Sequence, residues 1–506
     1  MKAKNIALIL TALVTLLLLP SCENLLKEEP KSFVNKEQFY KNKGQCLSAV
    51  NGCFIPLNSM FNTGFMTALE ACTDLAFLNS SELNAKFEIS PANPGMGAGL
   101  WTQAYRGIMY CNAAYVGLEG APIDEKDKNN FMAEVVTLRA YYYYVLTSTF
   151  GDVPFYRDDV SSLAVLDRIA KLPRMSAVET RNSLIEELQD FVEYLPAKKT
   201  SDITDNRISS SMAYILIAKM SMWNKKYDVA LEALKEIQLV YGTLDQYSLT
   251  DTFFRNKNTP ESIFEIQYTW SATGLKKTTN IACIFTPAKS SNSDIYDGVS
   301  IPELGSKANP YNSITPSDTL VRMYDKYKEP PILIEDPRGE MVIARTYNGT
   351  PFNRPKLGKP WMGPKFWCPG MDNVADGNNQ KVFRYADALL LMAECANELE
   401  NGTLAIECIN QVKKRAGIPL ITEYKDKYVM FDEIKEERAR ELMGEYTRKW
   451  DLVRWGTFYN DVLNSTGKEY ATIAENLRPF HEYYPIPDNE VVRSGGILTN
   501  DAYTGF

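Results

Sequence analysis

The sequence predicts a mostly α-helical protein in which tetratricopeptide-like helical hairpins form a scaffold for a large loop-rich, partly β segment. Apolar residues recur at helical spacing before residue 241 and again after residue 383. Between 242 and 382 this periodicity fades, and glycine, proline, asparagine and serine interrupt the chain at short intervals. We therefore expect helical regions at 36–241 and 383–506, which flank a loop-rich segment at 242–382.

The first residues have the pattern of an exported lipoprotein. Lys2 and Lys4 precede an apolar run at 6–19, which is too short to cross a bilayer but typical of a signal peptide. The run ends in Leu-Pro-Ser-Cys, which resembles a bacterial lipobox. We expect a signal peptide at 1–21, an acylated Cys22 that carries diacylglycerol and palmitate, and a flexible tether at 22–35. Several acyl chains hold a protein firmly, whereas one chain binds marginally. The alternative is an ordinary secretory signal followed by an incidental cysteine.

Composition excludes several functional classes. The net charge of −8 and a pI near 5.2 give no basic surface for nucleic acid. The only histidine is His481, which rules out His-rich metal sites. Its surroundings, "RPFHEYYPIP", favour a structural histidine in a turn over a catalytic base. Eight cysteines follow Cys22, and no CxxC occurs. We expect buried free thiols, with one or two disulfides as the alternative.

Helical spacing and capping signals set the expected helices before the loop-rich segment. Stripes of apolar residues predict helices at 100–118 and 129–150, the second ending at Gly151 and Pro154. Ser176 and Glu179 have the spacing of a capping box, which predicts that the next helix begins there. The connection of roughly 25 residues between these helices is longer than most.

Two helical pairs resemble each other in length and composition. The first pair covers 210–224 and 227–242, and the second covers 384–401 and 402–417. Each pair with its turn takes about 34 residues, the period of a tetratricopeptide repeat. A last, heavily charged helix is expected over 431–456, and the stretch 262–270 reads as a strand.

The charged helix admits two interpretations. Glu437 and Glu441 lie four residues apart and share a face, as a pair of catalytic carboxylates would. Arginines crowd the same segment, and a neighbouring arginine lowers a carboxyl pKa, which suits ion pairs rather than a general acid. We expect a structural network that includes Glu437, Glu441, Arg438, Arg440, Arg448 and Arg454.

The stretch 372–379, "DNVADGNN", resembles a calcium loop. Val374 and Phe383 occupy two positions where an EF-hand needs oxygen ligands. An Asn/Asp/Gly turn is the favoured interpretation, with calcium as the alternative. No cofactor is expected otherwise.

Aromatic residues of the loop-rich segment are the strongest indication of a binding site. A flat ring matches the C–H face of a sugar, while Asn, Asp or Arg beside it can bond the hydroxyls. Tyr296 and Tyr311 lie among such partners in "NSDIYDG" and "NPYNS", and Trp270 and Trp361 are further candidates. The alternative for each ring is packing beneath a long loop.

Four motifs resemble the SusD/RagB family of outer-membrane lipoproteins. They are "LRAYYYYVLTSTFGDVPF" at 138–155, "FRYADALLLMAECAN" with "INQVKKRAG", "EERARELMGEYTRKWDLVRWG", and "YYPIPDNEV" with "LTNDAY". Lys413 and Met443-Gly444 depart slightly from the family pattern. The resemblance covers nearly the whole chain after Cys22. It implies that Arg384, Glu394 and Asp451 join the ion-pair network and that Phe77 and Asn79 lie in another ligand-contacting loop.

The resemblance also implies a function. Family members are non-catalytic lipoproteins of the outer membrane that face the cell exterior and bind oligosaccharides, sometimes peptides. They act as a lid over a TonB-dependent, SusC-like transporter, which is therefore the expected partner. Two alternatives stay open: a surface glycoside hydrolase, and a scaffold of the outer-membrane complex that binds only proteins.

Overall fold

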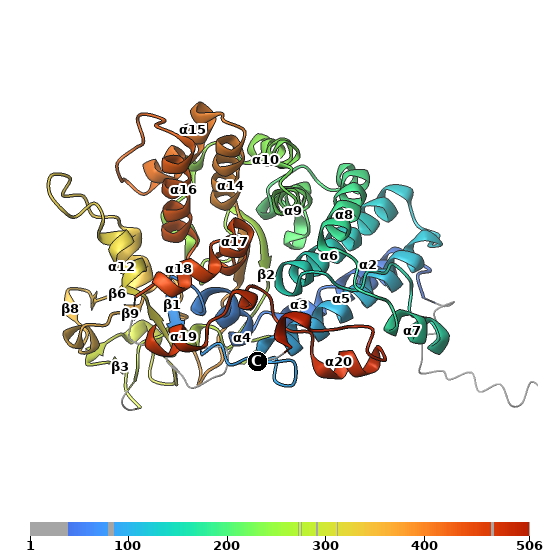
Figure 1. Ribbon diagram of the computed structural model, residues 1–506, viewed down its shortest axis with the longest axis horizontal. Helices are drawn as coiled ribbons and strands as arrows, with labels where there is room; N and C mark the ends of the chain where they lie inside the picture. The colour runs from blue at the N-terminus through green and yellow to red at the C-terminus, as the bar shows by residue number, and fades with distance from the viewer. Residues whose placement is uncertain are drawn as a thin grey trace, which may run out of the picture.

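The computed structural model describes residues 39–78, 86–271, 273–274, 276–289, 292–310, 312–466 and 470–504. Helices occupy the right and centre of Figure 1, and the loop-rich segment, coloured yellow to gold, lies at the left. Cys22, the expected signal peptide and the expected tether lie outside the described residues. Within the described part, no helix is long and apolar enough to cross a membrane.

Helices predominate among the described elements, and the strands are short. The α-helices are α2 (Lys43–Gly52), α3 (Ile55–Met60), α4 (Thr63–Met66), α5 (Met96–Glu119), α6 (Glu125–Phe150), α7 (Leu163–Ala170), α8 (Ala177–Phe191), α9 (Ser210–Trp223), α10 (Tyr227–Tyr241), α11 (Ala282–Phe285), α12 (Asp318–Asp325), α13 (Arg338–Val342), α14 (Tyr385–Glu398), α15 (Gly402–Arg415), α16 (Lys427–Leu442), α17 (Arg448–Trp455), α18 (Phe458–Asn464), α19 (Tyr470–Asn476) and α20 (Asp488–Arg493). The strands are β1 (Ala76–Leu78), β2 (Ser262–Ile266), β3 (Ile295–Tyr296), β4 (Val299–Ser300), β5 (Ile314–Pro316), β6 (Ile343–Ala344), β7 (Thr346–Tyr347), β8 (Thr350–Pro351), β9 (Trp361–Met362) and β10 (Gln380–Arg384).

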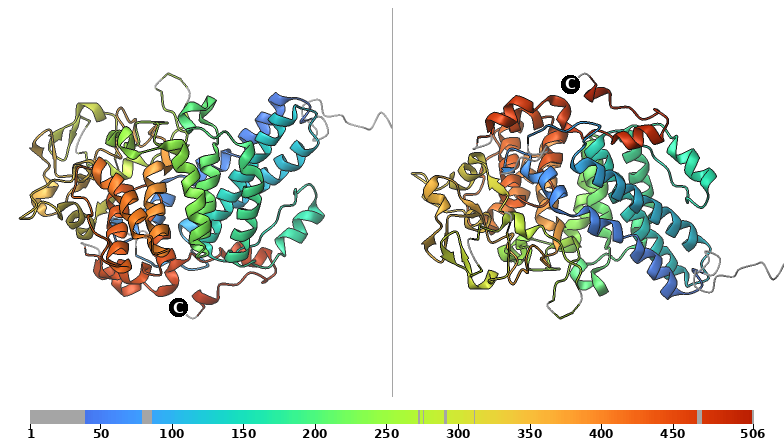
Figure 2. Two further views of the ribbon diagram at one scale, coloured as in Figure 1. Left: turned by 90° about the horizontal axis from the view of Figure 1, so that it is seen from above. Right: turned by 90° about the horizontal axis from the view of Figure 1, so that it is seen from below.

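The long helices pack side by side in a continuous row. Helix α5 packs on α6, α6 on α8, α8 on α9, and α9 on α10. The row continues from α10 to α14, which packs on both α15 and α16 (Figure 2). The pairs α9–α10 and α14–α15 are the expected hairpins, with boundaries within two residues of the sequence prediction at most ends. The mostly α-helical prediction is confirmed.

Helix α6 lies in the middle of this row and is surrounded by protein. Every residue from Phe131 to Phe150 is buried, so the aromatic run that marks the sequence is core. Helix α5 crosses closely at Gly107, where an added Cβ would lie 2.2 Å from the Tyr142 ring. Helix α8 begins as predicted: the Ser176 hydroxyl accepts from the Glu179 amide and lies 2.9 Å from its carboxylate.

The loop-rich segment is an insertion into the helical row. Strand β2 follows α10, β10 precedes α14, and the two strands pair antiparallel. This pairing closes the insertion at its base, so α10 and α14 contact each other directly although about 140 residues separate them along the chain. Strand β2 confirms the strand expected at 262–270 in its first half.

The single charged helix predicted at 431–456 is wrong. Helix α16 ends at Leu442 and α17 begins at Arg448, because Gly444 and Tyr446 adopt positive φ angles of 83° and 62°. The backbone amides left unpaired by this break donate hydrogen bonds to a residue that is distant in the sequence. The buried Glu70 carboxylate accepts from the amides of Gly444 (3.1 Å) and Thr447 (2.8 Å), and so caps the start of α17.

The predicted ion-pair network is confirmed, and it is buried. Glu441 accepts from Arg338, Arg384 and Arg415, which come from three different elements. These contacts hold the pKa of Glu441 well below its usual range against the opposing effect of burial. Beside it, Glu437 has a pKa lowered to about 2: burial raises the pKa, but Arg338 and Arg440 lower it more. Further buried pairs are Arg438–Asp451, Arg454–Glu394, Arg384–Glu445, Lys365–Glu445 and Arg448–Asp74.

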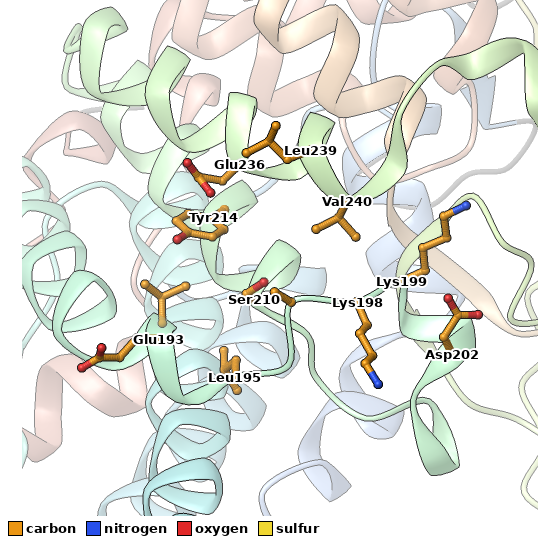
Figure 3. Close-up of a pocket in the computed structure, with 12 residues that line it drawn as sticks. Glu193, Leu195, Lys198, Lys199, Asp202, Ser210, Tyr214, Glu236, Leu239 and Val240 are labelled. Atoms are coloured by element: carbon orange, nitrogen blue, oxygen red, sulfur yellow. The ribbon is translucent and has the colours of Figure 1, made fainter.

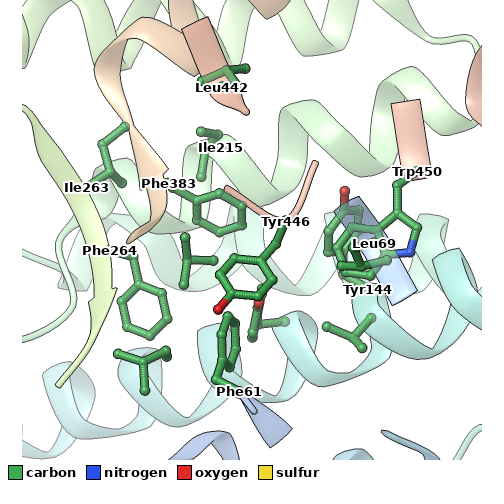
Figure 4. Packing of buried hydrophobic residues seen from close by; sticks show 14 of the residues in the cluster. Phe61, Leu69, Tyr144, Ile215, Ile263, Phe264, Phe383, Leu442, Tyr446 and Trp450 are labelled. Atoms are coloured by element: carbon green, nitrogen blue, oxygen red, sulfur yellow. The ribbon is translucent and has the colours of Figure 1, made fainter. Parts of the chain in front are cut away.

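An aromatic core joins the N-terminal helices to the C-terminal region. Figure 4 shows Tyr446 above Phe61 at the centre and Tyr144 beside Trp450 at the right. The Phe61 and Tyr446 ring centres are 4.8 Å apart, and those of Tyr144 and Trp450 are 5.3 Å apart. Segments from both ends of the chain therefore share one core.

The described cysteines and the histidine are structural. All eight cysteines after Cys22 are buried free thiols, which confirms the favoured interpretation over disulfides. His481 is buried, and its Nδ1 accepts from the Arg478 amide at 3.0 Å. Burial, together with Lys449 and Arg478 nearby, lowers its pKa to about 3. It is neutral at physiological pH and fills a turn, as predicted.

Candidate functional site

The candidate site begins with a tight hairpin in the loop-rich segment. Strands β3 and β4 pair Ile295 with Ser300 and Tyr296 with Val299, which leaves the two-residue turn Asp297-Gly298. Both turn residues have positive φ angles, 45° and 84°, as an Asp-Gly turn of this type requires. The turn projects the Asp297 carboxylate toward the segment 353–361.

Asp297 joins this hairpin to the loop that carries Trp361. Its Oδ2 accepts from the indole Nε1 of Trp361 at 2.8 Å and from the Arg354 amide at 2.6 Å. Its carbonyl accepts from the Asn353 amide at 3.1 Å. One carboxylate therefore fixes both the orientation of the indole and the start of the loop before it.

Arg354 covers the indole and reaches a third segment. Its guanidinium carbon lies 4.0 Å from the centre of the Trp361 ring, a cation–π arrangement. Its Nη2 donates to the Thr315 hydroxyl at 2.6 Å, and Thr315 lies opposite Phe77 in the β1–β5 pair. We call Tyr296, Asp297, Thr315, Arg354 and Trp361 the Trp361 cluster.

The cluster offers polar groups above an aromatic floor. Trp361 is 5% exposed and Thr315 is buried, whereas Asp297 and Arg354 are half-buried. Solvent therefore meets a guanidinium and a carboxylate, which can donate to and accept from hydroxyl groups. A ligand ring would stack on the indole only after Arg354 moved aside.

Two other predicted rings are packed within the protein. Tyr296 is fully buried, its hydroxyl donates to the Gly305 carbonyl at 2.7 Å, and burial raises its pKa to about 12. Phe77 is also buried and packs with Phe87 and Phe458 near α18. Neither ring presents a face to solvent in this structure. Their assignment as ligand contacts stays a prediction that would require the surrounding loops to open.

The remaining predicted residues are placed differently. Trp270 is half-exposed and lies against Gly377, where an added Cβ would come within 2.7 Å of the Trp270 amide. It makes no ring contact with the Trp361 cluster among the described residues. Asn79 and Tyr311 lie outside the described residues, as Cys22 does.

Sequence reasoning missed three members of the cluster. Asp297 stands in the quoted stretch "NSDIYDG", and its Asp-Gly turn was the available signal. Thr315 and Arg354 stand in segments without periodicity, and only their folded contacts with Trp361 and with each other reveal them.

The stretch at 372–379 folds as a turn around Asp376. This buried carboxylate accepts from the amides of Ala282 and Asn378, at 2.9 and 3.0 Å. Burial raises its pKa to about 6. In the part of the chain that the structure describes, no group of three or more His, Cys, Asp or Glu residues could hold a metal ion.

A cavity of about 570 Å³ lies on the helical scaffold, away from the predicted ligand residues. The segment after α8 forms one wall, and α9 and α10 form the other. Figure 3 shows Tyr214 beside Glu236 within it, with Lys198 and Asp202 at the far side. Leu239 on its rim is 79% exposed. None of the predicted ligand residues lines it.

Two family models match the regions of this chain that carry the motifs. Residues 56–222 match the family described as "Starch-binding associating with outer membrane", and residues 369–503 match the SusD family. A SusD-like protein of Formosa agariphila is 27% identical over 523 aligned residues, which cover 95% of this chain and 96% of that protein.

Solved structures show the same fold. A laminarin-binding SusD-like protein is 22% identical with a TM-score of 0.73, over 92% of this chain and 100% of that chain. Surface glycan-binding protein A from Bacteroides thetaiotaomicron, in complex with laminarihexaose, is 20% identical with a TM-score of 0.69 and the same coverage. Family models, relatives along nearly the whole chain and the shared fold together identify the chain as a SusD-like protein.

Proposed function

We propose that the chain binds an oligosaccharide at the cell surface, without cleaving it, and delivers it to a TonB-dependent, SusC-like transporter. The observation that carries this proposal is the likeness, along nearly the whole chain, to proteins named for glycan binding. The family that matches residues 56–222 is described as starch-binding and associated with the outer membrane.

The Trp361 cluster supplies suitable chemistry for a sugar. Arg354 donates hydrogen bonds, Asp297 accepts them, and sugar hydroxyls do both. The Trp361 indole lies beneath Arg354 and is 5% exposed, so a sugar would meet the guanidinium and the carboxylate first. The Asp297 bonds fix this arrangement before a ligand arrives, which lowers the entropy lost on binding.

Four buried carboxylates with shifted pKa values serve the fold rather than hydrolysis. A glycosidase needs two carboxyl groups at a cleft, one of which keeps its proton near neutral pH. Glu437 and Glu441 are buried in ion pairs that lower their pKa values. Glu70 and Asp376 have pKa values raised by burial to about 7 and about 6, but both are buried and bonded to backbone amides.

The anchor and the partner are parts of the same proposal. Acylated Cys22 holds the body at the outer face of the outer membrane, and the segment after it supplies slack. The transporter lies beneath the body and receives the ligand. The competing functions are a surface glycoside hydrolase, which would cleave the ligand, and a purely protein-binding scaffold, which would bind no oligosaccharide.

Substitution of Arg354 tests the site. Arg354→Ala removes the donor above the indole, and we expect affinity for the bound oligosaccharide to fall about tenfold, the effect of one charged hydrogen bond. Arg322→Ala, which removes an exposed arginine of α12, is the matched control and should leave affinity unchanged. Isothermal titration gives both values. Equal affinity of the two variants would show that the ligand binds elsewhere.

A further inference from the structure

We propose that a groove between α2, α3 and strand β2 is a second saccharide-binding site, separate from the Trp361 cluster. The inference rests on the proposed glycan-binding function and extends it to a part of the surface outside that cluster. Residues from the N-terminal helices, from the segment 205–207 and from β2 meet there.

The groove has the size and floor of a small-molecule site. Its volume is about 340 Å³, within the roughly 300–1,000 Å³ typical of ligand pockets. Phe54 is half-buried and lies at the groove, while Leu57, Phe264 and Ile266 are buried beneath it. An apolar floor with one accessible aromatic ring suits the C–H face of a sugar.

Hydrogen bonds to the protein hold two polar side chains of the groove, Arg207 and Asn58, in place. Arg207 donates to the buried Glu134 carboxylate at 2.9 and 2.6 Å, and to Asn51 Oδ1 at 2.9 Å. Asn58 Nδ2 donates to the Gln267 carbonyl at 3.1 Å, which fixes α3 to the end of β2. The groove is therefore shaped before any ligand arrives.

Three polar side chains at the groove have hydrogen-bonding capacity left over. Among the described residues, the side chains of Asp205, Asn206 and Lys277 form no hydrogen bond or ion pair. Asp205 and Asn206 follow one another with positive φ angles of 58° and 49°, a turn conformation that Asp and Asn tolerate. A carboxylate, an amide and an ammonium group together match hydroxyls, which both donate and accept.

Lys277 gives the groove an uncompensated cation. Lys277 is exposed, and partial desolvation lowers the pKa of its ammonium group. The backbone of Lys277 pairs with that of Thr269 through two hydrogen bonds of 2.8 Å. The half-exposed Trp270 follows Thr269 directly in the chain. Trp270 itself does not line the groove.

Titration of single variants tests the second site. The full chain with Cys22→Ala is titrated with laminarihexaose, maltohexaose and tetragalacturonate, and each is repeated with Lys277→Ala and with Phe54→Leu. We expect at least one probe to lose about tenfold in affinity with Lys277→Ala and to weaken with Phe54→Leu. Lys276→Ala, the neighbouring exposed lysine outside the groove, should bind like the parent chain. Unchanged thermal melting confirms that each variant is folded.

The same titrations separate the two proposals. If a probe binds, loses affinity with Arg354→Ala and binds all three other variants equally, the second site is overturned and the proposed function stands. If no saccharide probe binds the parent chain, the groove is not a saccharide site for these ligands and the proposal falls. A probe that weakens with Lys277→Ala but not with Arg354→Ala places the main site at the groove and supports the inference.

Discussion

The crossing of α5 and α6 predicts opposite effects for two glycine substitutions in one helix. At Gly107 a new Cβ would lie 2.2 Å from the Tyr142 ring, which is buried and donates its hydroxyl to the Cys53 carbonyl at 2.7 Å. At Gly99 no heavy atom lies within 4 Å of the new Cβ. Overpacking a core costs about 1–3 kcal/mol, and displacing the Tyr142 hydroxyl adds about 1 kcal/mol. Alanine regains about 1 kcal/mol of helix propensity at either position.

We therefore expect Gly107→Ala to lower the free energy of unfolding by about 1–3 kcal/mol. Gly99→Ala should raise the free energy of unfolding by up to about 1 kcal/mol, because only the propensity gain applies. Urea unfolding of the mature chain, followed by circular dichroism, measures both changes. Equal effects of the same sign would refute the close approach of the two helices at Gly107.

Three further predictions concern charge and anchoring. Glu441→Gln should lower the free energy of unfolding by about 3–5 kcal/mol, because it removes one negative charge from a buried network and leaves one positive charge there uncompensated, although each arginine keeps another carboxylate. The exposed Glu232→Gln should change the free energy of unfolding by less than about 1 kcal/mol, and denaturant unfolding measures both values; equally small effects at the two sites would contradict the prediction. The pKa of Glu437 is lowered in the folded state to about 2. Its contribution to the free energy of unfolding is therefore fully present above the unfolded value near 4.5 and is lost as pH falls toward 2. Acid unfolding that is already complete at pH 6 would contradict this assignment. Cys22→Ala should release the protein from membranes with its circular dichroism unchanged, and a monomeric variant that still sediments with outer membranes would show another anchor.

The helical scaffold could be predicted because the residues that begin and end each helix lie within or beside that helix in the sequence. The capping residues Ser176 and Glu179 and the stop at Gly151 lie beside the helices that they bound, and their effects confirm the prediction. The break between α16 and α17 was missed because helical spacing continues through it. A distant residue, Glu70, stabilises the break, because its carboxylate accepts hydrogen bonds from the amides at the start of α17.

The candidate site was only partly predictable for the same reason. Composition singled out Trp361, and the Asp297-Gly298 turn was readable in the sequence. Asp297 and Trp361 stand 64 residues apart and meet through a direct hydrogen bond. Arg354 and Thr315, which complete the cluster, stand in segments without periodicity. Burial also cannot be read from residue type: Tyr296 and Trp270 looked equivalent, yet one is core and the other is half-exposed.

The most direct test of the account is a binding and turnover measurement on the mature chain with a broad oligosaccharide panel. Isothermal titration gives affinity, and chromatography of the recovered ligand shows whether it was cut. We predict reversible binding of at least one oligosaccharide, which is recovered intact and bound about tenfold more weakly by Arg354→Ala. Cleavage of the ligand, or binding of peptides with no oligosaccharide bound, would contradict the account.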